Sequence, residues 1–385
     1  MSATVPSTAP PHAPSAAGRI RFQHPELPPM EEVLAYFERS REACWFSNGG
    51  PCASELTARL EARLGGDTTC VLVANATLGL MAALRAACGE SGGLIVTPSY
   101  TFTATACAIR WAGFEPLFVD VDARNWQLHP AQLDRALAER GGEIAGVLAC
   151  ATFGTAPPPE VRSAWRELTA ASGVPLVIDS APGFGSLDLH GRPLGGLGDT
   201  EVFSFHATKP FAIGEGGMVA TADPELAARI ASLINFGLDE TRISMDAGLN
   251  AKLSELHAAT GLAALDRFDG VLAARRRVAG ALRQATSRCG LTLQAGSGGS
   301  TWQFFQALAP DAAAREAVLD AARDLHVEAR TLHAPPLHRH PAFVAAPRHG
   351  SLAVTDDLAA RSLSLPLAND MTQAAVDRVA EAVRC

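Results

Sequence analysis

The sequence predicts an α/β protein in which helices cover a largely parallel β-sheet. From Thr69 onward, short apolar runs alternate with longer segments of helical periodicity, the pattern of repeated strand and helix units. Most of the short runs are continuously apolar, which is typical of strands buried on both faces of a sheet. The 385 residues are 48% hydrophobic, which is enough for two domains with separate cores. We therefore expect a large domain with a mostly parallel seven-stranded sheet and a smaller C-terminal α+β domain.

Two helices precede the sheet, whose elements then follow in order. The first helix is expected at 29–43, before the turn Ser47–Pro51, and the second at 55–64, where Gly65 and Gly66 end it. The apolar runs predict strands at 70–74, 94–97, 116–121, 145–150, 175–179, 201–205 and 218–220. Helical spacing predicts helices at 77–87, 102–111, 130–138, 160–172, 225–234 and 253–266.

The character of the chain divides it into four parts. Residues 1–20 are rich in Pro, Ala and Ser and are expected to form a disordered tail, and residues 21–50 an N-terminal segment that packs near the small domain. Residues 51–267 form the expected large domain. The small domain, residues 268–385, begins with Ala/Arg-rich helices and continues with a strand at 302–308, a His/Pro-rich loop at 332–343 and a closing helix at 373–384.

Charge and cysteine usage exclude several classes of function. The net charge of −8 and the absence of a Lys/Arg-rich block disfavour binding to nucleic acid or to an anionic membrane. The apolar, uncharged stretch 94–109 contains Pro98 and is too short to span a bilayer. The eight cysteines form no CxxC pair and have no histidine at zinc-ligand spacing, so we expect no metal site. A soluble protein of the reducing cytoplasm fits these features best.

Lysine is rare in this chain, which makes Lys209 a candidate for chemistry. The only lysines are Lys209 and Lys252, and arginine fills the other basic positions. Arginine does not form a Schiff base because its guanidinium keeps its proton, whereas a lysine amine becomes nucleophilic once its pKa is lowered. A surface lysine after a strand is the alternative interpretation of this residue taken alone.

Five other residues lie at or after the carboxyl ends of predicted strands. Ala76 and Thr77 start a helix after the first strand, so they could hold a phosphate or simply belong to an ordinary helix cap. Phe102 follows the second strand and could stack on a ligand or pack in the core. Asp179 ends the fifth strand, where a carboxylate needs a cation or a hydrogen-bond donor. Ser204 precedes Lys209 and could donate its hydroxyl or be an ordinary strand serine.

The order of these positions favours one cofactor. A phosphate cradle, an aromatic ring, an acid and a lysine, each after a strand of one sheet, are the parts that hold pyridoxal phosphate. The acid would pair with the ring nitrogen and keep it protonated. At ~4 Å in a partly shielded site this ion pair contributes on the order of 4 kcal/mol.

The chain resembles the sugar aminotransferase family of fold type I pyridoxal phosphate enzymes, also called the DegT/DnrJ/EryC1/StrS family. The resemblance extends over residues 27–384. It is carried by motifs that appear in the family's order, namely SNGGP at 47–51, NATLGL at 75–80, TPSYTFTATACAIRWAGFEPLFVDVD at 97–122, VIDSAPGFGS at 177–186, GRPLGGLGDTEVFSFHATKPFAIGEGGMV at 191–219, NFG at 235–237, NAKLSELHAATGLAALDRFD at 250–269, and later PPLHRHPAF and LSLPL.

The resemblance implies a role for each candidate residue. Lys209 would be the Schiff-base lysine, Asp179 the partner of the pyridine nitrogen and Phe102 the stacking ring. The phosphate would be held by three residues of the same chain, Ala76, Thr77 and Ser204. In the family, an asparagine at the position of Asn235 reaches the phosphate of the neighbouring subunit, which implies a homodimer with shared active sites.

The resemblance also implies the reaction. An aminotransferase would move an amino group from glutamate or glutamine to a ketone, in most relatives on a nucleotide-linked sugar of an antibiotic or glycan pathway. Relatives that are dehydratases replace the lysine with histidine, so Lys209 argues against that branch. A non-sugar substrate or another reaction of the same cofactor is an alternative, and a non-catalytic regulatory protein is a weaker one. Pro182 stands where the family usually has His or Gln near the cofactor ring, so the substrate pocket is expected to differ.

Overall fold

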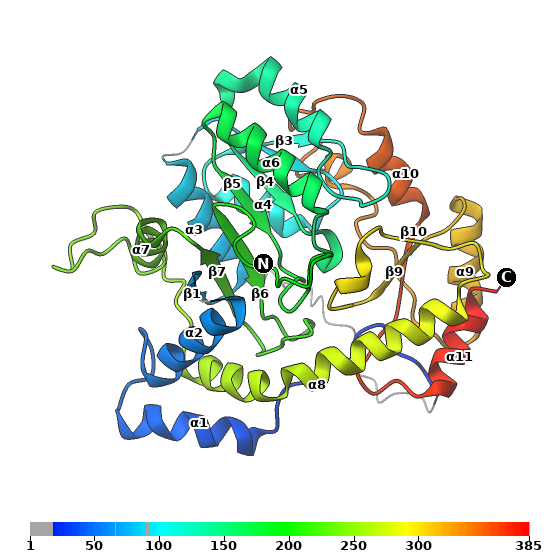
Figure 1. Ribbon diagram of the computed structural model, residues 1–385, viewed down its shortest axis with the longest axis horizontal. Helices are drawn as coiled ribbons and strands as arrows, with labels where there is room; N and C mark the ends of the chain where they lie inside the picture. The colour runs from blue at the N-terminus through cyan, green and yellow to red at the C-terminus, as the bar shows by residue number, and fades with distance from the viewer. Residues whose placement is uncertain (1–17, 66, 90–91, 385) are drawn as a thin grey trace, which may run out of the picture.

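The computed structural model describes residues 18–65, 67–89 and 92–384, so most of the predicted tail lies outside the described residues. The predicted α/β fold with a mostly parallel seven-stranded sheet is confirmed (Figure 1). The strand order is β1-β7-β6-β5-β4-β2-β3. The strands are β1 (Thr69–Val73), β2 (Leu94–Pro98), β3 (Glu115–Val119), β4 (Ile144–Cys150), β5 (Leu176–Asp179), β6 (Thr200–Ser204) and β7 (Gly217–Thr221).

Only β7 runs against its neighbours. It pairs antiparallel with both β1 and β6, whereas the pairs among β2, β3, β4, β5 and β6 are parallel. The carboxyl ends of six strands therefore meet at one edge of the sheet, the edge where open α/β sheets bind ligands. The register places Gly217 opposite both Val73 and Ser204, which brings the ends of β1 and β6 together.

Each face of the sheet has its own core because side chains alternate along every strand. On β1, Val71 and Val73 face one cluster, formed with helices α3 (Ala76–Cys88), α4 (Thr103–Trp111) and α7 (Pro224–Leu233). Cys70 and Leu72 face the other cluster, formed with α2 (Pro51–Leu64), α5 (Pro130–Arg140), α6 (Pro159–Ser172) and the first half of α8 (Glu255–Ala285). Three short 3-10 turns, η1 (Gly141–Glu143), η2 (Thr152–Gly154) and η4 (Leu337–Arg339), lie in the connections.

A second, antiparallel sheet lies near the C-terminus. Its order is β10-β9-β8, and its core includes Phe305, Leu363 and Val379. The elements are β8 (Thr292–Leu293), η3 (Ser297–Gly299), β9 (Phe305–Leu308), α9 (Ala312–Asp324), α10 (Ala353–Arg361), β10 (Ser362–Leu365) and α11 (Gln373–Ala382). The predicted strand at 302–308 starts late because Trp302 has a φ of 55°, which is outside the β region.

One long helix joins the two sheets. The sequence predicts that the helix after the NAKLSE motif ends near 266, which is wrong, because α8 continues to Ala285 and reaches the small sheet (Figure 1). No proline interrupts it, and both halves bury apolar residues, such as Leu262 and Leu282. This packing offsets the cost of Gly270 and Gly280, which is about 1 kcal/mol each. The division at 267/268 falls within this helix and stays a prediction.

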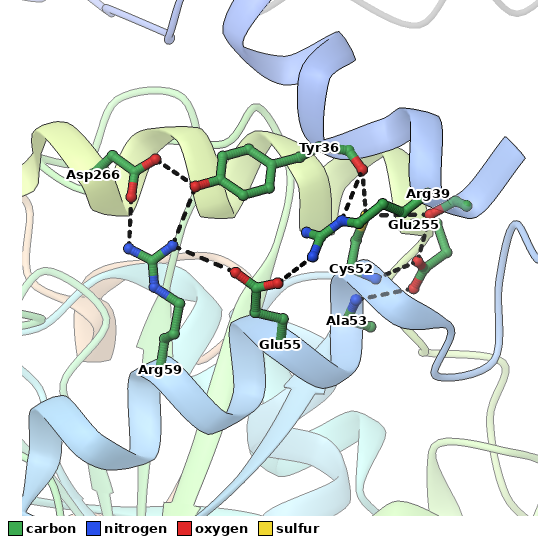
Figure 2. Close-up of polar contacts among 9 residues, drawn as sticks. Tyr36, Arg39, Cys52, Ala53, Glu55, Arg59, Glu255 and Asp266 are labelled. Carbon is green, nitrogen blue, oxygen red and sulfur yellow. Dashed lines mark hydrogen bonds and ion pairs between the residues drawn. The ribbon is translucent and has the colours of Figure 1, made fainter. Parts of the chain in front are cut away.

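A polar cluster fixes the starts of α2 and α8 together with α1 (Met30–Glu42), as Figure 2 shows. Glu255 is fully buried, and its Oε2 accepts hydrogen bonds of 2.7 Å from the Ser40 hydroxyl and from the Cys52 N–H. Its Oε1 accepts from the Ala53 N–H over 3.0 Å. A side chain on Gly50 would meet the Glu255 carboxylate at 2.7 Å, which explains the second glycine of the SNGGP motif. Glu255 therefore caps α2 and holds α8 against it.

The segment before α1 is held against the small sheet. Ile20 forms a bridge with Val327, and the Phe22 ring stacks on Phe304 with centroids 4.4 Å apart. Arg19 pairs with Glu328 over 2.8 Å. Among the described helices, none combines the length and the apolar character needed to cross a bilayer.

Candidate active site

Lys209 lies in the connection between β6 and β7, which folds back on itself. Phe205 N–H donates to Gly216 O over 2.9 Å, and Ala207 N–H donates to Gly214 O over 2.7 Å. The chain reverses at Gly214, whose φ of 95° favours glycine. Lys209 N–H then donates to His206 O over 2.8 Å, which fixes the backbone at the lysine.

The lysine amine is in an environment that favours its neutral form. Burial lowers the pKa of Lys209 to about 8, although the charge of Asp179 opposes this change. The Lys209 Nζ donates a hydrogen bond of 3.2 Å to Gln303 Oε1. At pH 7.5, about a quarter of the molecules of a group with this pKa are free amine, against about one in a thousand at the ordinary pKa of lysine. This side chain is therefore suited to act as a nucleophile and a base.

Asp179 is the last residue of β5 and is only 7% exposed. Its Oδ2 accepts a hydrogen bond of 2.8 Å from the Thr105 hydroxyl, and its Oδ1 one of 3.1 Å from the Ala181 N–H. Burial raises the pKa of Asp179, while these hydrogen bonds and the charge of Lys209 oppose the rise. A cationic ligand group would stabilise the ionised carboxylate here.

The start of α3 lies beside the same edge of the sheet. Asn75 caps the helix by accepting a hydrogen bond of 3.0 Å from the Leu78 N–H, so the first turn, with Ala76 and Thr77, begins at this edge. A Cβ on Gly217 would lie 2.9 Å from Ala76 N and fill the space beside the helix end. Because Gly217 pairs with Ser204, the serine reaches the same place. Helix N-termini bind anions through their free N–H groups and the helix dipole.

Phe102 directly precedes α4 and is 65% exposed, whereas Tyr100 two residues earlier is fully buried. Its helix is attached to the site because Thr105, one turn further on, binds Asp179. An exposed ring at this position has a free face for a planar ligand. Stacking of Phe102 on a cofactor stays a prediction.

Asn235 lies on a separate segment, which borders the end of β1 because Ala74 N–H donates to Ala251 O over 2.7 Å and Ala251 N–H donates to Ile234 O over 2.9 Å. It follows α7 and forms a bridge with Asn250 at the base of a loop that projects from the body of the protein (Figure 1). Lys252, the other lysine, makes its contacts within this region. Its Nζ donates to Asn250 Oδ1 over 2.8 Å and lies 4.6 Å from the Phe236 ring centroid. Lys252 is therefore unlike Lys209, which faces Asp179 and Gln303.

Sequence reasoning missed three residues around Lys209 and Asp179. Thr105 lies in the hydroxyl-rich PSYTFTAT motif, from which only Phe102 was selected. Gln303 comes from the segment before β9, and no spacing rule links it to Lys209. His333 stacks on Phe153 with centroids 4.7 Å apart, and burial and the charge of Lys209 lower its pKa to about 3, so the imidazole is neutral. The only sequence feature that pointed to His333 is its place in the His/Pro-rich loop at 332–343.

Pro182 is held between two other segments. Its carbonyl accepts a hydrogen bond of 2.9 Å from the Thr301 hydroxyl, and a Cβ on Gly154 would lie 2.6 Å from the same oxygen. The loop after Asp179 thus has a fixed path between Gly154 and the segment that carries Gln303. In the described part of the chain, no group of three or more His, Cys, Asp or Glu residues is arranged to hold a metal ion.

Comparison with known proteins identifies relatives that cover nearly the whole chain. The chain is 39% identical over 378 residues to protein Rv3402c of Mycobacterium tuberculosis, covering 96% of this chain and 90% of the relative. It is 28% identical over 371 residues to dTDP-4-amino-4,6-dideoxy-D-glucose transaminase of Shigella dysenteriae, covering 95% and 98%. The crystal structure of DesI in the presence of its TDP-sugar product superimposes with a TM-score of 0.86 at 34% identity, covering 95% and 92%.

The model of the DegT/DnrJ/EryC1/StrS aminotransferase family matches residues 29–384. The match includes every strand of the large sheet and the edge where Lys209, Asp179 and the start of α3 come together. The chain therefore belongs to the DegT/DnrJ/EryC1/StrS aminotransferase family, and it is a pyridoxal phosphate-dependent aminotransferase of fold type I.

Proposed function

We propose that this enzyme transfers an amino group from glutamate or glutamine to a ketone on a nucleotide-linked sugar. One observation carries the proposal, the desolvated amine of Lys209 beside Asp179 at the sheet edge where α3 begins. Two relatives support the acceptor class, because one is a dTDP-sugar transaminase and the other was crystallised with its TDP-sugar product. We also propose a role in natural-product or glycan biosynthesis in the cytoplasm, which the acceptor class and the sequence features support.

The residues at this edge fit pyridoxal phosphate. When bound, the cofactor supplies an aldehyde that captures amines and a ring that withdraws electrons from them. Ala76 and Thr77 would hold the phosphate through the N-terminus of α3, with Ser204 adding a hydroxyl. The space that a Cβ on Gly217 would fill supports this assignment, since a side chain there would meet Ala76 N at 2.9 Å.

Asp179 and Phe102 would orient the ring of the cofactor. The Asp179 carboxylate would pair with the protonated ring nitrogen, which compensates the cost of burying the acid. Thr105 holds one carboxylate oxygen and the Ala181 N–H the other, so the carboxylate has a fixed plane. The exposed Phe102 ring would cover one face of the cofactor and exclude water from it.

Lys209 would bind the cofactor covalently and then act as the base that moves a proton on the substrate. A pKa of about 8 makes the amine able to accept a proton at neutral pH and to give it back. His333 is neutral near the lysine and contributes no competing positive charge. Lys209 would thus be the base at the centre of the proposed site.

A homodimer with shared active sites is part of the proposal. Asn235 starts a loop with exposed apolar side chains, Phe236, Ile243 and Met245, whose exposed fractions are 47%, 59% and 72%. Exposed apolar residues gathered on one projecting loop are typical of a protein contact. Asn235 of one subunit would then bind the phosphate held by its partner.

The proposal is tested with purified protein and added pyridoxal phosphate. Wild type should develop the visible absorbance of a lysine-bound cofactor, and Lys209→Ala should not, while both fold alike by circular dichroism. Glutamate and a panel of nucleotide-linked keto sugars should then yield 2-oxoglutarate and an amino sugar. Cyclitol ketones and the same sugars without a nucleotide form the comparison panel. Turnover of cyclitol ketones alone would replace the sugar proposal with a non-sugar acceptor.

A further inference from the structure

The Gln303 side chain lies between the Lys209 amine and the backbone next to it. Gln303 is 7% exposed, and its Oε1 accepts the hydrogen bond of 3.2 Å from Lys209 Nζ. Its Nε2 donates over 3.1 Å to the carbonyl of Thr208. A lysine amine offers hydrogen atoms and a carbonyl accepts them, so these two partners fix which end of the amide faces the lysine.

The backbone of Gln303 is held by the buried guanidinium of Arg275. Its Nη2 donates to Gln303 O over 2.7 Å, and Nε and Nη2 both donate to Trp302 O, over 3.0 and 2.8 Å. Burial lowers the pKa of Arg275 to about 10, so it keeps its charge at neutral pH. A planar guanidinium with several carbonyl partners holds this segment more firmly than single hydrogen bonds would.

The same support extends to the N-terminal segment. Arg275 Nη1 donates over 2.8 Å to Asn369 Oδ1, and Asn369 Nδ2 donates over 2.7 Å to Glu26 Oε2. Phe304, which directly follows Gln303, stacks on the ring of Phe22. Gln303 is thus held at its side chain, at its carbonyl and through the neighbouring residue.

We propose that Gln303 is a positioning residue for Lys209, and that its amide oxygen keeps the amine aimed into the active site while the lysine is not bonded to the cofactor. The amide has a specific advantage in this place. Its oxygen accepts a hydrogen bond from the neutral amine and a somewhat stronger one from the ammonium, and it has no proton of its own to exchange. A carboxylate would instead favour the ammonium and hold the proton that Lys209 must pass on. This inference rests on the proposed role of Lys209.

The test compares wild type with Gln303→Leu and Gln303→Glu in the full chain freed of cofactor. Trace acetic anhydride acetylates lysines in proportion to their free amine, and mass spectrometry separates Lys209 from Lys252. Lys252 serves as the internal reference. At pH 7, acetylation of Lys209 relative to Lys252 should rise about 3-fold in Gln303→Leu, which removes an acceptor for the ammonium. In Gln303→Glu it should fall about 10-fold, because an added anion favours the ammonium.

A carboxylate at position 303 lowers the reactivity of Lys209 only if it lies against the amine, so Gln303→Glu tests the contact that the proposal requires. Opposite shifts with a constant Lys252 therefore support the proposal, and equal Lys209 reactivity in wild type and Gln303→Glu overturns it. Gln303→Glu is close in size to the wild-type residue, so its result decides the matter even where Gln303→Leu folds poorly. In the holoenzyme, Gln303→Leu should lower kcat about 10-fold or more with little change in KM. Opposite acetylation shifts in a protein without transaminase activity would count against the proposed function and leave the positioning intact.

Discussion

The hydroxyl of Thr105 donates a hydrogen bond of 2.8 Å to Oδ2 of Asp179, and the two residues come from different strand–helix units. Thr105 is in the first turn of α4 and Asp179 at the end of β5, and both are buried. Thr101 in turn contacts the Thr105 hydroxyl at 3.0 Å. The motif that contains Phe102 therefore also holds the Asp179 carboxylate in place through Thr105.

We expect Thr105→Val to weaken binding of pyridoxal phosphate by about 10-fold. Valine keeps the shape of threonine and removes the donor, and a hydrogen bond to a charged group contributes about 1.5–3 kcal/mol. Equilibrium dialysis of the cofactor measures the change. Thr103→Val on the same helix is the control, because the Thr103 hydroxyl contacts the Cys107 sulfur at 3.8 Å and does not touch Asp179. Equal affinities in the two variants would contradict the role of Thr105.

Lys209 costs the folded protein stability at neutral pH. Its pKa is about 8 in the folded chain and 10.5 ordinarily, so at pH 7 burial of the ammonium is unfavourable. A folded-state pKa that is depressed means that stability is gained as pH rises from about 8 to 10.5. Lys209→Met should therefore stabilise the cofactor-free protein at pH 7 by about 1–3 kcal/mol, with a smaller gain at pH 10.

Urea unfolding of the cofactor-free protein at the two pH values checks this expectation. Lys252→Met is the matched control, because it removes the only other lysine, which lies outside the Lys209 environment. A stability gain for Lys209→Met that is the same at pH 7 and pH 10 would show that charge burial is not its cause.

The buried carboxylate of Glu255 and the half-exposed one of Glu55, both drawn in Figure 2, should differ in their contribution to stability. Glu255→Gln should lower the free energy of unfolding by about 2 kcal/mol, because in either orientation of the amide its NH₂ group faces a backbone donor, the N–H of Cys52 or that of Ala53. Glu55 pairs with Arg39 and Arg59 at a half-exposed position, so Glu55→Gln should cost about 0.5 kcal/mol. Urea unfolding at pH 7 compares them, and a larger loss for Glu55→Gln would contradict this ranking.

The large sheet could be predicted from the sequence because its strands are short continuous apolar runs with helices between them. The same reasoning failed where tertiary contacts decide the local structure. The α8 helix continues past 266 because its second half packs on the small sheet, a contact that has no local signal. β10 was missed because the four residues SLSL pair with β9, a strand far away in the sequence.

In the candidate site too, residues placed by local sequence could be predicted, and residues placed by tertiary packing could not. Lys209 and Asp179 follow strands, so their place at the sheet edge is encoded by the neighbouring sequence. Gln303 reaches Lys209 from a segment 94 residues away, and Arg275 fixes it from a third element. Such partners are set by how the small sheet packs against the large one, which hydrophobic periodicity does not describe.

Shared active sites predict a specific pattern of rescue between inactive variants. Lys209→Ala should abolish activity, and Asn235→Ala should lower it about 10-fold or more, because a hydrogen bond to a charged phosphate is lost. If Asn235 serves the partner's site, a mixed dimer of the two variants has one site with both residues intact. Random assortment of equal amounts then leaves about a quarter of all sites active, since about half of the dimers are mixed.

If Asn235 instead serves the site of its own subunit, every site in the mixed dimer carries one substitution, and mixing rescues nothing. Co-expression of the two variants with different affinity tags, followed by purification of the mixed dimer, therefore separates the two arrangements by activity alone. A second measurement tests whether the loop forms the dimer contact. The exposed side chains of Phe236, Ile243 and Met245 should become protected from solvent in the dimer. A Met245→Glu variant should shift the protein toward monomer in sedimentation. Activity should fall in proportion to the dimer fraction, because in the monomer no Asn235 from a partner reaches the phosphate.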